Sequence, residues 1–571
     1  MSIAIFIRAI LYDCLYKGKI DKKELERLKL SVEVRSTQTI DLQKYVGTHR
    51  NDNLSERIGD SVGWDYAEAG GLQRELKQTP WAFHRGERRF MTWMLVAALN
   101  ERSVFKDALP FFYLYILIKI RFRRDYVKTN PLIGLQNFNH YYHALDKYKD
   151  DDWFKIKEKF NYALTTSVRK GTKDTVEMRL SPNLFDMIKD TKWFDGREDV
   201  SFVLTLFKSC NSEKKVATTK YARLQMEQID LLRQILVQIR EKSRLTVVGI
   251  DVVGSDLTCR PYVIAPFLRY AAEKGVSNIT YHVAEDFCDV IDGLRALYEL
   301  ITFAEYKAGY RIGHASVLGV NVEKYYRERK NNVVCSRQML LDNYIWLSRI
   351  IRVLNISITP DLQRELETKA KEQFEEIYPK FAFSVDDYWD SIHLRGDITD
   401  AVVEELQIRN VFKALRCNAS RCANARKNKK AIAYWHEYLK TNDKGEEIVL
   451  VRHSKPVVDL IEEVRKATMK LFSVNKYRVE SNPTSNLMIG PFDMYKDLPT
   501  FRFQDNKVDV SVNTDAKGVF ATSLYIEYSL LALALQKDSK DWRTIEKIIS
   551  ELLTNSHNQR FGKIKLKSIV G

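Results

Sequence analysis

The stretch NITYHVAEDF, residues 278–287, brings a histidine and two adjacent acids together. The spacing of His282 and Glu285 is unusual for a shared site, because side chains three apart on a regular strand point to opposite faces. Both can serve one site only if the strand ends between them and the chain turns. A neutral imidazole can bind a metal, and a carboxylic acid can supply a proton. The stretch therefore predicts a reactive site or, as the simpler alternative, an ordinary polar strand end.

Other candidate residues follow short β-branched runs elsewhere in the chain. His314, Gly254, Ser485 and Asp515 all come at the ends of such runs. Each has a simpler explanation when taken alone: a polar residue at a strand end, a tight turn for Gly254, or turn chemistry for Asp515. Their convergence on strand ends is more informative than any one of them. Asp286 is expected to face the N-terminus of the following helix, where an acid is favoured.

The runs that carry these residues alternate with helical patterns. There are seven of them: TVEMRLSP (175–182), VSFVLTLFKS (200–209), LTVVGIDVVGSD (245–256), NITYHVAED (278–286), YRIGHASVLG (310–319), YRVESNPTSN (477–486) and KVDVSVNTDA (507–516). Amphipathic stretches such as 221–242 and 289–306 lie between them. This alternation indicates an α/β fold with a parallel sheet covered by helices. An eighth strand would close a (β/α)8 TIM barrel, whose active site gathers at the carboxyl ends of the strands.

The same pattern predicts four segments. Residues 1–80 form an N-terminal segment in which the first barrel strand is missing or degenerate, with 2–8 and 30–36 as the candidates for it. Residues 81–319 begin with a helical region and carry the first part of the barrel. Residues 320–475 form a large, mostly helical, basic insertion after the sixth strand, and residues 476–571 supply the last strands and the C-terminal helices.

Composition limits the partners and the compartment. The chain has 91 lysines and arginines against 75 acids, a formal net charge of +16, which favours anionic partners such as nucleotides, nucleic acid or an acidic subunit. Seven scattered cysteines indicate reduced thiols. The longest apolar run, residues 109–120, is too short to span a bilayer, and no signal peptide is evident. A cytoplasmic protein without a membrane segment is expected.

Several of the motifs, in their order along the chain, resemble those of the adenosine/AMP deaminase family. They are HVAED, RIGHA, NPTSN and VNTDAKGVFATSLYIEY, supported by VEMRLSP, VVGIDVVGSD and TNSHNQRFG. The resemblance covers roughly residues 170–320 and 475–565, with a weaker helical match over 80–165. The family is a group of TIM-barrel hydrolases that use Zn²⁺ and water to replace the 6-amino group of adenine and release ammonia.

The resemblance implies a role for each candidate residue. His282 and Asp515 would bind the zinc ion, and Glu285 would donate a proton to ring N1. His314 would orient and deprotonate the water. Gly254 and Ser485 would contact the substrate, with the Gly254 N–H approaching the purine edge.

Two departures from the family pattern concern these roles. The family carries a His-x-His pair at the end of its first strand, and no such pair occurs in this sequence. The missing pair implies either a strand that lies upstream of Met1 or lost ligands. The family also has two adjacent acids where this chain has Asp515 and Ala516, so purine recognition differs in detail.

The stretch WAFHRGERRF (81–90), the insertion and the basic charge resemble one subgroup, the deaminase subunits of the bacterial RADAR anti-phage system. This resemblance implies a large homo-oligomer with a partner ATPase. The substrates would be ATP and dATP, converted to ITP and dITP, or alternatively adenosine in RNA. His84 and Glu87 would contact substrate phosphate or support the site, and a helix N-terminus with surface charges is the alternative.

Two other classes of function stay open from the sequence. The missing His-x-His pair and Ala516 are compatible with a catalytically inactive deaminase-like scaffold that binds nucleotide or a partner ATPase. An amidohydrolase that acts on another amine or amide is the third hypothesis.

Overall fold

The computed structural model divides into two compact units, Met1–Thr129 and Asn130–Gly571. The residues that it describes are 7–8, 10–12, 14–15, 20, 22–23, 25–26, 90–97, 105–127, 135, 175–208, 222–240, 245–398, 403, 419–440, 443–516, 520, 522–538, 540 and 541–562.

In the first unit, the apolar run at 109–120 lies within one helix. A 3-10 turn, η3 (Lys106–Ala108), leads into α6 (Leu109–Val127). Phe90 packs edge-to-face against Phe112 and Tyr115, with ring centroids 6.0 Å and 5.7 Å away. Phe111, Phe112, Tyr115 and Ile116 of the run are buried, so the run belongs to a partly buried helix. None of the described helices, α6 included, is both long and apolar enough to cross a membrane.

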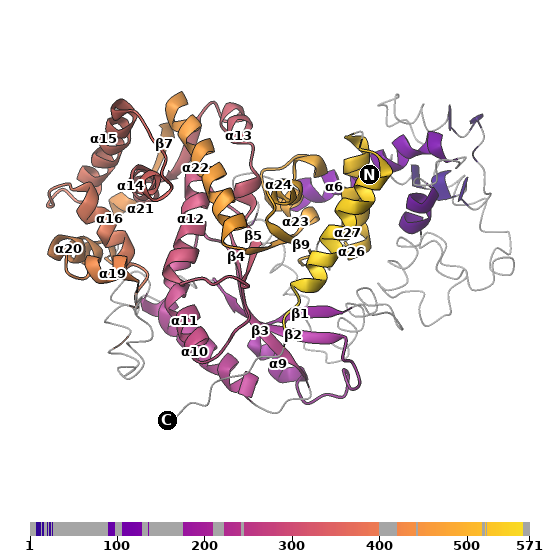
Figure 1. Ribbon diagram of the computed structural model, residues 1–571, viewed down its shortest axis with the longest axis horizontal. Coiled ribbons are helices and arrows are strands. Elements are labelled where there is room, and N and C mark those ends of the chain that lie inside the picture. Colours follow the sequence, from indigo (N-terminus) through magenta and orange to yellow (C-terminus); the bar gives the residue numbers. More distant parts are fainter. Residues whose placement is uncertain are drawn as a thin grey trace. The chain divides into compact units, whose positions relative to one another are not determined.

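The second unit is built on a seven-stranded parallel sheet (Figure 1). Its order is β1-β2-β3-β4-β5-β8-β9, so neighbours in the sheet follow one another along the chain. All seven predicted strands are confirmed: β1 (Val176–Leu180), β2 (Val200–Phe207), β3 (Val247–Val253), β4 (Ile279–Val283), β5 (Arg311–His314), β8 (Arg478–Ser481) and β9 (Asp509–Val512).

Helices follow the strands and complete the α/β alternation. They are α9 (Pro182–Ile188), α10 (Ala222–Arg240), α11 (Pro261–Glu273), α12 (Val290–Phe303), η6 (Ser316–Gly319), α23 (Pro483–Ile489), η8 (Tyr495–Asp497), α24 (Pro499–Asp505), α26 (Leu524–Lys537) and α27 (Trp542–Asn558). The predicted α/β, TIM-barrel-like fold class is confirmed.

Among the described residues no strand precedes β1 in the sheet, and the sequence predicts that the first barrel strand is missing or degenerate. Ile7 and Arg8, at the end of the candidate segment 2–8, are helical, so that segment is not a strand up to its end. The other candidate, 30–36, lies outside the described residues.

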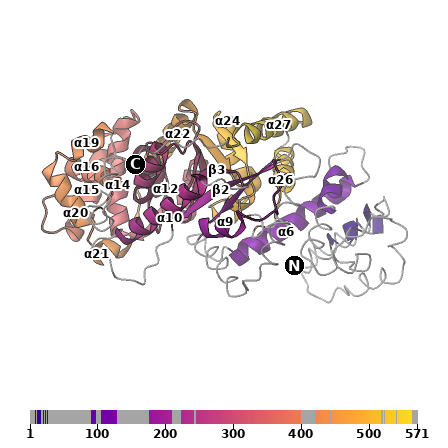
Figure 2. The ribbon, with the colours of Figure 1, turned by 90° about the horizontal axis from the view of Figure 1, so that it is seen from below.

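Between β5 and β8 the chain forms the mostly helical insertion. Its elements are α13 (Val322–Glu328), β6 (Asn332–Ser336), α14 (Arg337–Val353), α15 (Pro360–Ile377), α16 (Val385–Leu394), α19 (Ser420–Ala425), α20 (Lys429–Tyr438), α21 (Asp443–Glu446), β7 (Ile448–Arg452) and α22 (Lys455–Val474). In both views α15, α16, α19 and α20 gather at one end of the unit, away from the parallel sheet (Figures 1 and 2). The antiparallel pair β6–β7 was not predicted.

Some basic side chains of the insertion form ion pairs with acidic side chains of the same segment. Arg426 pairs with Asp397 at 2.7 Å, and Lys430 lies 3.6 Å from Asp387. These two basic side chains therefore have partners of opposite charge within the same segment. They contribute to internal packing as well as to the basic surface.

Toward the amino ends of its strands, the parallel sheet packs against the aromatic ring of Phe561. Phe561 is buried with Val203 and Val248, and the guanidinium of Arg311 lies 3.5 Å from the centroid of its ring. A Cβ on Gly249 would lie 2.8 Å from the Phe561 ring, so only glycine allows the ring to approach so closely.

Replacing Phe561 by leucine is expected to lower the free energy of unfolding by about 1–2 kcal/mol. Leucine keeps an apolar filling but removes the cation–π contact with Arg311, which is buried and desolvated. Urea unfolding of the variant and the wild type measures the difference, and equal midpoints would contradict it.

Candidate active site

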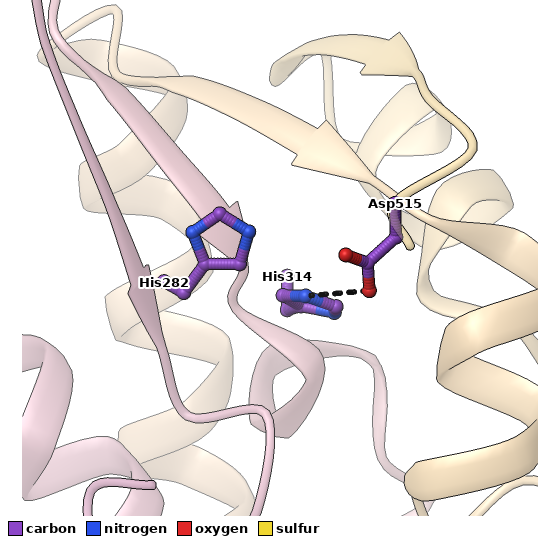
Figure 3. A group of neighbouring side chains, drawn as sticks. All are labelled: His282, His314 and Asp515. Atoms are coloured by element: carbon purple, nitrogen blue, oxygen red, sulfur yellow. Dashed lines mark ion pairs between the residues drawn. The ribbon is translucent and has the colours of Figure 1, made fainter. Parts of the chain in front are cut away.

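The site residues meet where the parallel strands end. His282 lies in β4, His314 is the last residue of β5, and Asp515 follows β9 by three residues. One ligand atom from each of the three lies within 4.8 Å of the others, and Figure 3 shows the side chains converging from separate strands. The carboxyl ends of parallel strands share one edge of the sheet, which is why residues far apart in sequence come together. Glu285 joins them, with Oε1 3.4 Å from Nε2 of His314.

The turn that the spacing of His282 and Glu285 requires is present. Strand β4 ends at Val283, and Ala284 adopts a left-handed backbone with φ 51°. A buried ion pair holds this turn: Lys208 Nζ lies 2.6 Å from Asp256 Oδ1. Lys208 also donates to the carbonyl of His282 at 2.5 Å, and the Ala284 N–H donates to Asp256 Oδ2 at 2.6 Å. Glu285 therefore turns back toward the histidines.

The orientation of His282 is fixed by a buried acid. Its Nδ1 donates to Asp251 Oδ1 at 3.1 Å, so the lone pair of a neutral ring resides on Nε2. Burial alone would raise the pKa of Asp251, but His282 and Arg179 outweigh it and hold this pKa below its ordinary value. An ionised Asp251 thus favours the tautomer whose Nε2 is available as a ligand.

Arg179 joins the acids behind the site. Its Nε lies 2.9 Å from Asp251 Oδ2, its Nη2 binds Glu480, and its Nη1 is 3.5 Å from Nε2 of His282. Burial would raise the pKa of Glu480, but Arg179 and Arg311 overcome this effect and lower it to about 2. Both acids next to Arg179 are therefore ionised at neutral pH, which offsets the arginine's charge.

His314 is held as a neutral base. It adopts φ 64°, its Nδ1 donates to Asn486 Oδ1 at 2.7 Å, and its Nε2 accepts from Asn482 Nδ2 at 3.1 Å. Burial lowers the pKa of His314 to about 4. The Nε2 lone pair faces Glu285 and also Asp515, whose Oδ2 is 3.7 Å away.

Glu285 has the opposite character. Burial raises its pKa well above the ordinary value, and the nearby charges of Asp515 and Asp286 raise it further. A carboxylic acid with this environment stays protonated at higher pH than a free one. The site thus combines a neutral base and a protonated acid within hydrogen-bonding reach of a common space.

The remaining sequence-predicted residues are placed differently. Gly254 follows β3 with φ 114°, a backbone conformation that favours glycine, and a Cβ there would be 3.1 Å from that of Lys208. Ser485 lies in α23 and is buried, and its Oγ has no hydrogen-bond partner among the described residues. His84 and Glu87 lie outside the described residues.

The expectation for Asp286 is wrong. Its Oδ2 accepts a hydrogen bond from Ser255 Oγ at 2.6 Å, whereas α12 is capped by Asp289, whose Oδ1 accepts from the Ile291 N–H at 3.3 Å. The cap is three residues further along because the turn at Ala284 is followed by a loop before the helix begins. Burial, and then the charge of Asp256, raise the pKa of Asp286 to about 7.

The donor set fits a divalent metal ion. His282 and Asp515 supply an imidazole and a carboxylate, which are ligand types of catalytic zinc sites, and Asp251 supplies the usual carboxylate behind a ligating histidine. His314, the third member of the cluster, offers one lone pair, on Nε2, either to an ion or to a proton. Ala516, which stands where the resembling family has a second acid, packs on the apolar cluster of Leu135, Met488, Ile489 and Phe520. This position therefore serves packing here and offers no carboxylate.

Sequence reasoning missed the residues that support the site. These are Arg179, Lys208, Asp251, Asp256, Glu480, Asn482 and Asn486. The available signal was their place on or directly after strands of the same parallel sheet. A charged residue inside an otherwise apolar run is a second signal, and Asp251 in VVGIDVV is an example.

Comparison with known proteins gives a family match to part of the chain. Residues 458–558 match the family model for adenosine deaminase. Among solved structures, an adenine deaminase from Arthrobacter aurescens is similar, with 10% identity, 81% of this chain and 93% of that chain covered, and a TM-score of 0.31. No curated protein matches. The family match supports a relationship to the adenosine deaminases for the segment that carries β8, β9 and Asp515.

Proposed function

We propose that this protein is a metal-dependent hydrolytic deaminase of adenosine or adenine nucleotides. The observation that carries the proposal is the meeting of a neutral imidazole, His314, with an acid of raised pKa, Glu285, beside two further donors. Hydrolytic removal of an amino group from an adenine ring needs a base for the water and an acid for the ring nitrogen. The adenosine deaminase match over 458–558 supports the same reaction.

Each residue has a distinct task in this proposal. A bound zinc ion would lower the pKa of water to about 7. His282 and Asp515 would hold the ion, and the Nε2 lone pair of His314 takes a proton from the attacking water. Glu285 donates its proton to ring N1 as the oxygen adds to C6. The protonated His314 then gives its proton to the amino group, which leaves as ammonia, and the carboxylate of Glu285 takes the hydroxyl proton as the C6 carbonyl forms. Gly254, Ser485, His84 and Glu87 are proposed to contact the substrate.

The finer parts of the proposal rest on the sequence resemblance. We propose zinc as the metal and ATP and dATP as substrates, with adenosine in RNA as the alternative. We also propose a cytoplasmic role in anti-phage defence, a large homo-oligomer and a partner ATPase. The formal charge of +16 supports an anionic substrate. The segments 1–80, 81–319, 320–475 and 476–571 are the proposed structural divisions.

One alternative is favoured by a specific observation. The absence of a His-x-His motif from the sequence and the apolar packing of Ala516 favour a catalytically inactive scaffold that binds nucleotide or the partner ATPase. An amidohydrolase acting on another amine is distinguished from both by its substrate.

Metal analysis combined with a product assay tests these readings. Purified protein is expected to hold about one zinc ion per chain and to convert at least one of ATP, dATP, AMP, adenosine and RNA to the inosine product. Zinc-free protein without turnover of any purine would contradict the proposal, and turnover of a non-purine amine alone would favour the amidohydrolase.

His282→Ala and Asp515→Ala are each expected to reduce the bound zinc at least tenfold, because each removes one of the two proposed ligands. His436→Ala is the control, since His436 lies in α20 of the insertion and outside the donor cluster. Unchanged zinc content in both site variants would place the metal elsewhere.

A further inference from the structure

The loop between Glu285 and α12 is held from two sides. On the side of the sheet, Asp256 binds the Ala284 N–H at 2.6 Å and Ser255 binds Asp286 at 2.6 Å. On the other side, the loop contacts the insertion. Glu285 begins this short loop, and the insertion-side contacts are made three and four residues further along, by Cys288 and Asp289.

The contact on the insertion side is a buried hydrogen bond between Asp289 and His453. Asp289 Oδ2 accepts from His453 Nε2 at 3.1 Å, and both side chains are fully buried. Nδ1 of His453 lies 3.4 Å from the hydroxyl of Tyr344, and Tyr326 donates to Asp289 Oδ1. His453 comes directly after β7, and its N–H donates to the carbonyl of Asn331 at 2.9 Å. Both ring nitrogens of His453 and its backbone N–H thus have hydrogen-bonding partners, which fix the position of the side chain.

Two weaker contacts follow the same route. The hydroxyl of Tyr325 donates to the carbonyl of Cys288 at 3.3 Å, and the thiol of Cys288 lies 3.0 Å from the sulfur of Met339. The insertion residues in these contacts belong to α13 or α14, or lie directly beside the strands of the β6–β7 ribbon. The loop that carries Glu285 is therefore shaped by a segment outside the parallel sheet.

We propose that His453 is a positioning residue that fixes the loop of Glu285 through Asp289, and so couples the insertion to the reacting groups. Asp289 has two tasks, since it also caps α12 with its Oδ1. Loss of the imidazole leaves Oδ2 of this buried carboxylate without its hydrogen bond, although Tyr326 and the Ile291 N–H still bind Oδ1. Local opening of the segment lets water reach the unpaired oxygen and so becomes more favourable. The catalytic consequence rests on the proposed deaminase function, but the structural coupling does not.

Hydrogen–deuterium exchange tests the coupling without any need for turnover. In His453→Phe, which keeps a ring in the cavity, the amides of residues 284–291 are expected to exchange at least tenfold faster than in the wild type. His393→Phe is the matched control. It also removes a buried imidazole of the insertion. The Nε2 of His393, however, lies 3.0 Å from the hydroxyl of Tyr298 in α12 and does not contact the loop of Glu285. The same amides are expected to be unchanged there, and unchanged exchange in His453→Phe would overturn the proposal.

If His453→Phe does not fold, Asp289→Asn replaces it, because asparagine keeps the capping oxygen and removes the charge that faces His453. The same acceleration over residues 284–291 is expected, and its absence would also overturn the proposal.

Kinetics then test the consequence for Glu285. His453→Phe is expected to lower kcat about tenfold with KM within twofold, and His453→Gln, which retains an N–H donor, is expected to recover part of the loss. In a Glu285→Gln background His453→Phe should cause no further loss of kcat, because it acts through Glu285. Additive losses would contradict the positioning role. A wild type without deaminase activity would end the proposed function and leave the exchange result to decide the coupling.

Discussion

Glu285→Gln is expected to lower kcat about 10²–10⁴-fold, the range typical for loss of a positioned general acid. Glutamine has nearly the same shape and can still occupy the space beside His314, but it has no acidic proton to give to the substrate. Glu285 Oε1 lies 3.4 Å from His314 Nε2. The substitution therefore removes an acidic proton next to His314 and changes the packing of the site very little. Steady-state assays of the variant and the wild type measure the effect.

The pH dependence follows from the two pKa shifts, with opposite signs. Glu285 must be protonated, and because burial raises its pKa, activity is retained below that raised pKa and is lost as pH rises through it. His314 must be neutral, so activity is lost as pH falls through its pKa of about 4. The residual activity of Glu285→Gln is expected not to fall at high pH, because the group whose deprotonation causes that fall has been removed. Glu323→Gln, at an exposed position in α13, is the control and should keep both limbs.

Stability separates a chemical effect from unfolding. A carboxyl group whose folded pKa is raised costs stability once the pH exceeds its unfolded pKa of about 4.3, because the folded state must then bind a proton that the unfolded state does not. Glu285→Gln removes that cost and is expected to be at least as stable as the wild type at neutral pH. An inactive variant that is also much less stable would point to misfolding instead.

Lys208→Met is expected to lower the free energy of unfolding by about 3–5 kcal/mol, because it leaves the buried carboxylate of Asp256 without its partner. The ammonium of Lys208 also holds the carbonyl of His282 at 2.5 Å, so the turn that aims Glu285 loses its main support. Activity should therefore fall together with stability. Urea unfolding followed by circular dichroism gives the energy difference.

A matched surface pair provides the control for this prediction. Lys324 lies 2.9 Å from Asp493, but both side chains are more than a third exposed, so Lys324→Met is expected to change stability by less than about 1 kcal/mol. Adding Asp256→Asn to Lys208→Met should recover part of the loss, since the unpaired charge is then removed. If Lys208→Met and Lys324→Met lowered the free energy of unfolding equally, burial would not be the reason why the Lys208–Asp256 pair stabilises the protein.

The strands could be predicted from the sequence because their signal is local. Runs such as VSFVLTLF and VVGIDVV are buried on both faces, so nearly every position is apolar, and the runs reappear as β2 and β3. The β6–β7 ribbon was missed because its two strands lie more than a hundred residues apart in a charged segment. Exposed residues such as Ile448 and Leu450 in β7 give no clear alternation of apolar and polar positions.

The site was predictable only in part, for a related reason. His282, Glu285, His314 and Asp515 lie at strand ends within short recognisable motifs. Their supporting contacts join residues that are far apart in sequence, and nothing local in the sequence specifies such a pairing.

The separations show how non-local these contacts are. Lys208 and Asp256 are 48 positions apart, Asp289 and His453 are 164 apart, and Arg179 and Glu480 are 301 apart. Each pair depends on the register between strands or on the path of the insertion, both of which emerge only when the whole unit is folded.

The pairing of β5 with β8 has a consequence for the order in which the protein is made. Residues 315–477 separate the two strands, and at a synthesis rate of about 5–20 residues per second they take roughly 8–33 seconds to emerge. During this interval β5 presents an unpaired edge beside His314. The insertion, which can begin to fold before β8 exists, already contacts the loop of Glu285 through His453. A nascent chain would thus carry three of its four reacting groups, and an open strand edge in need of protection, before Asp515 has been translated.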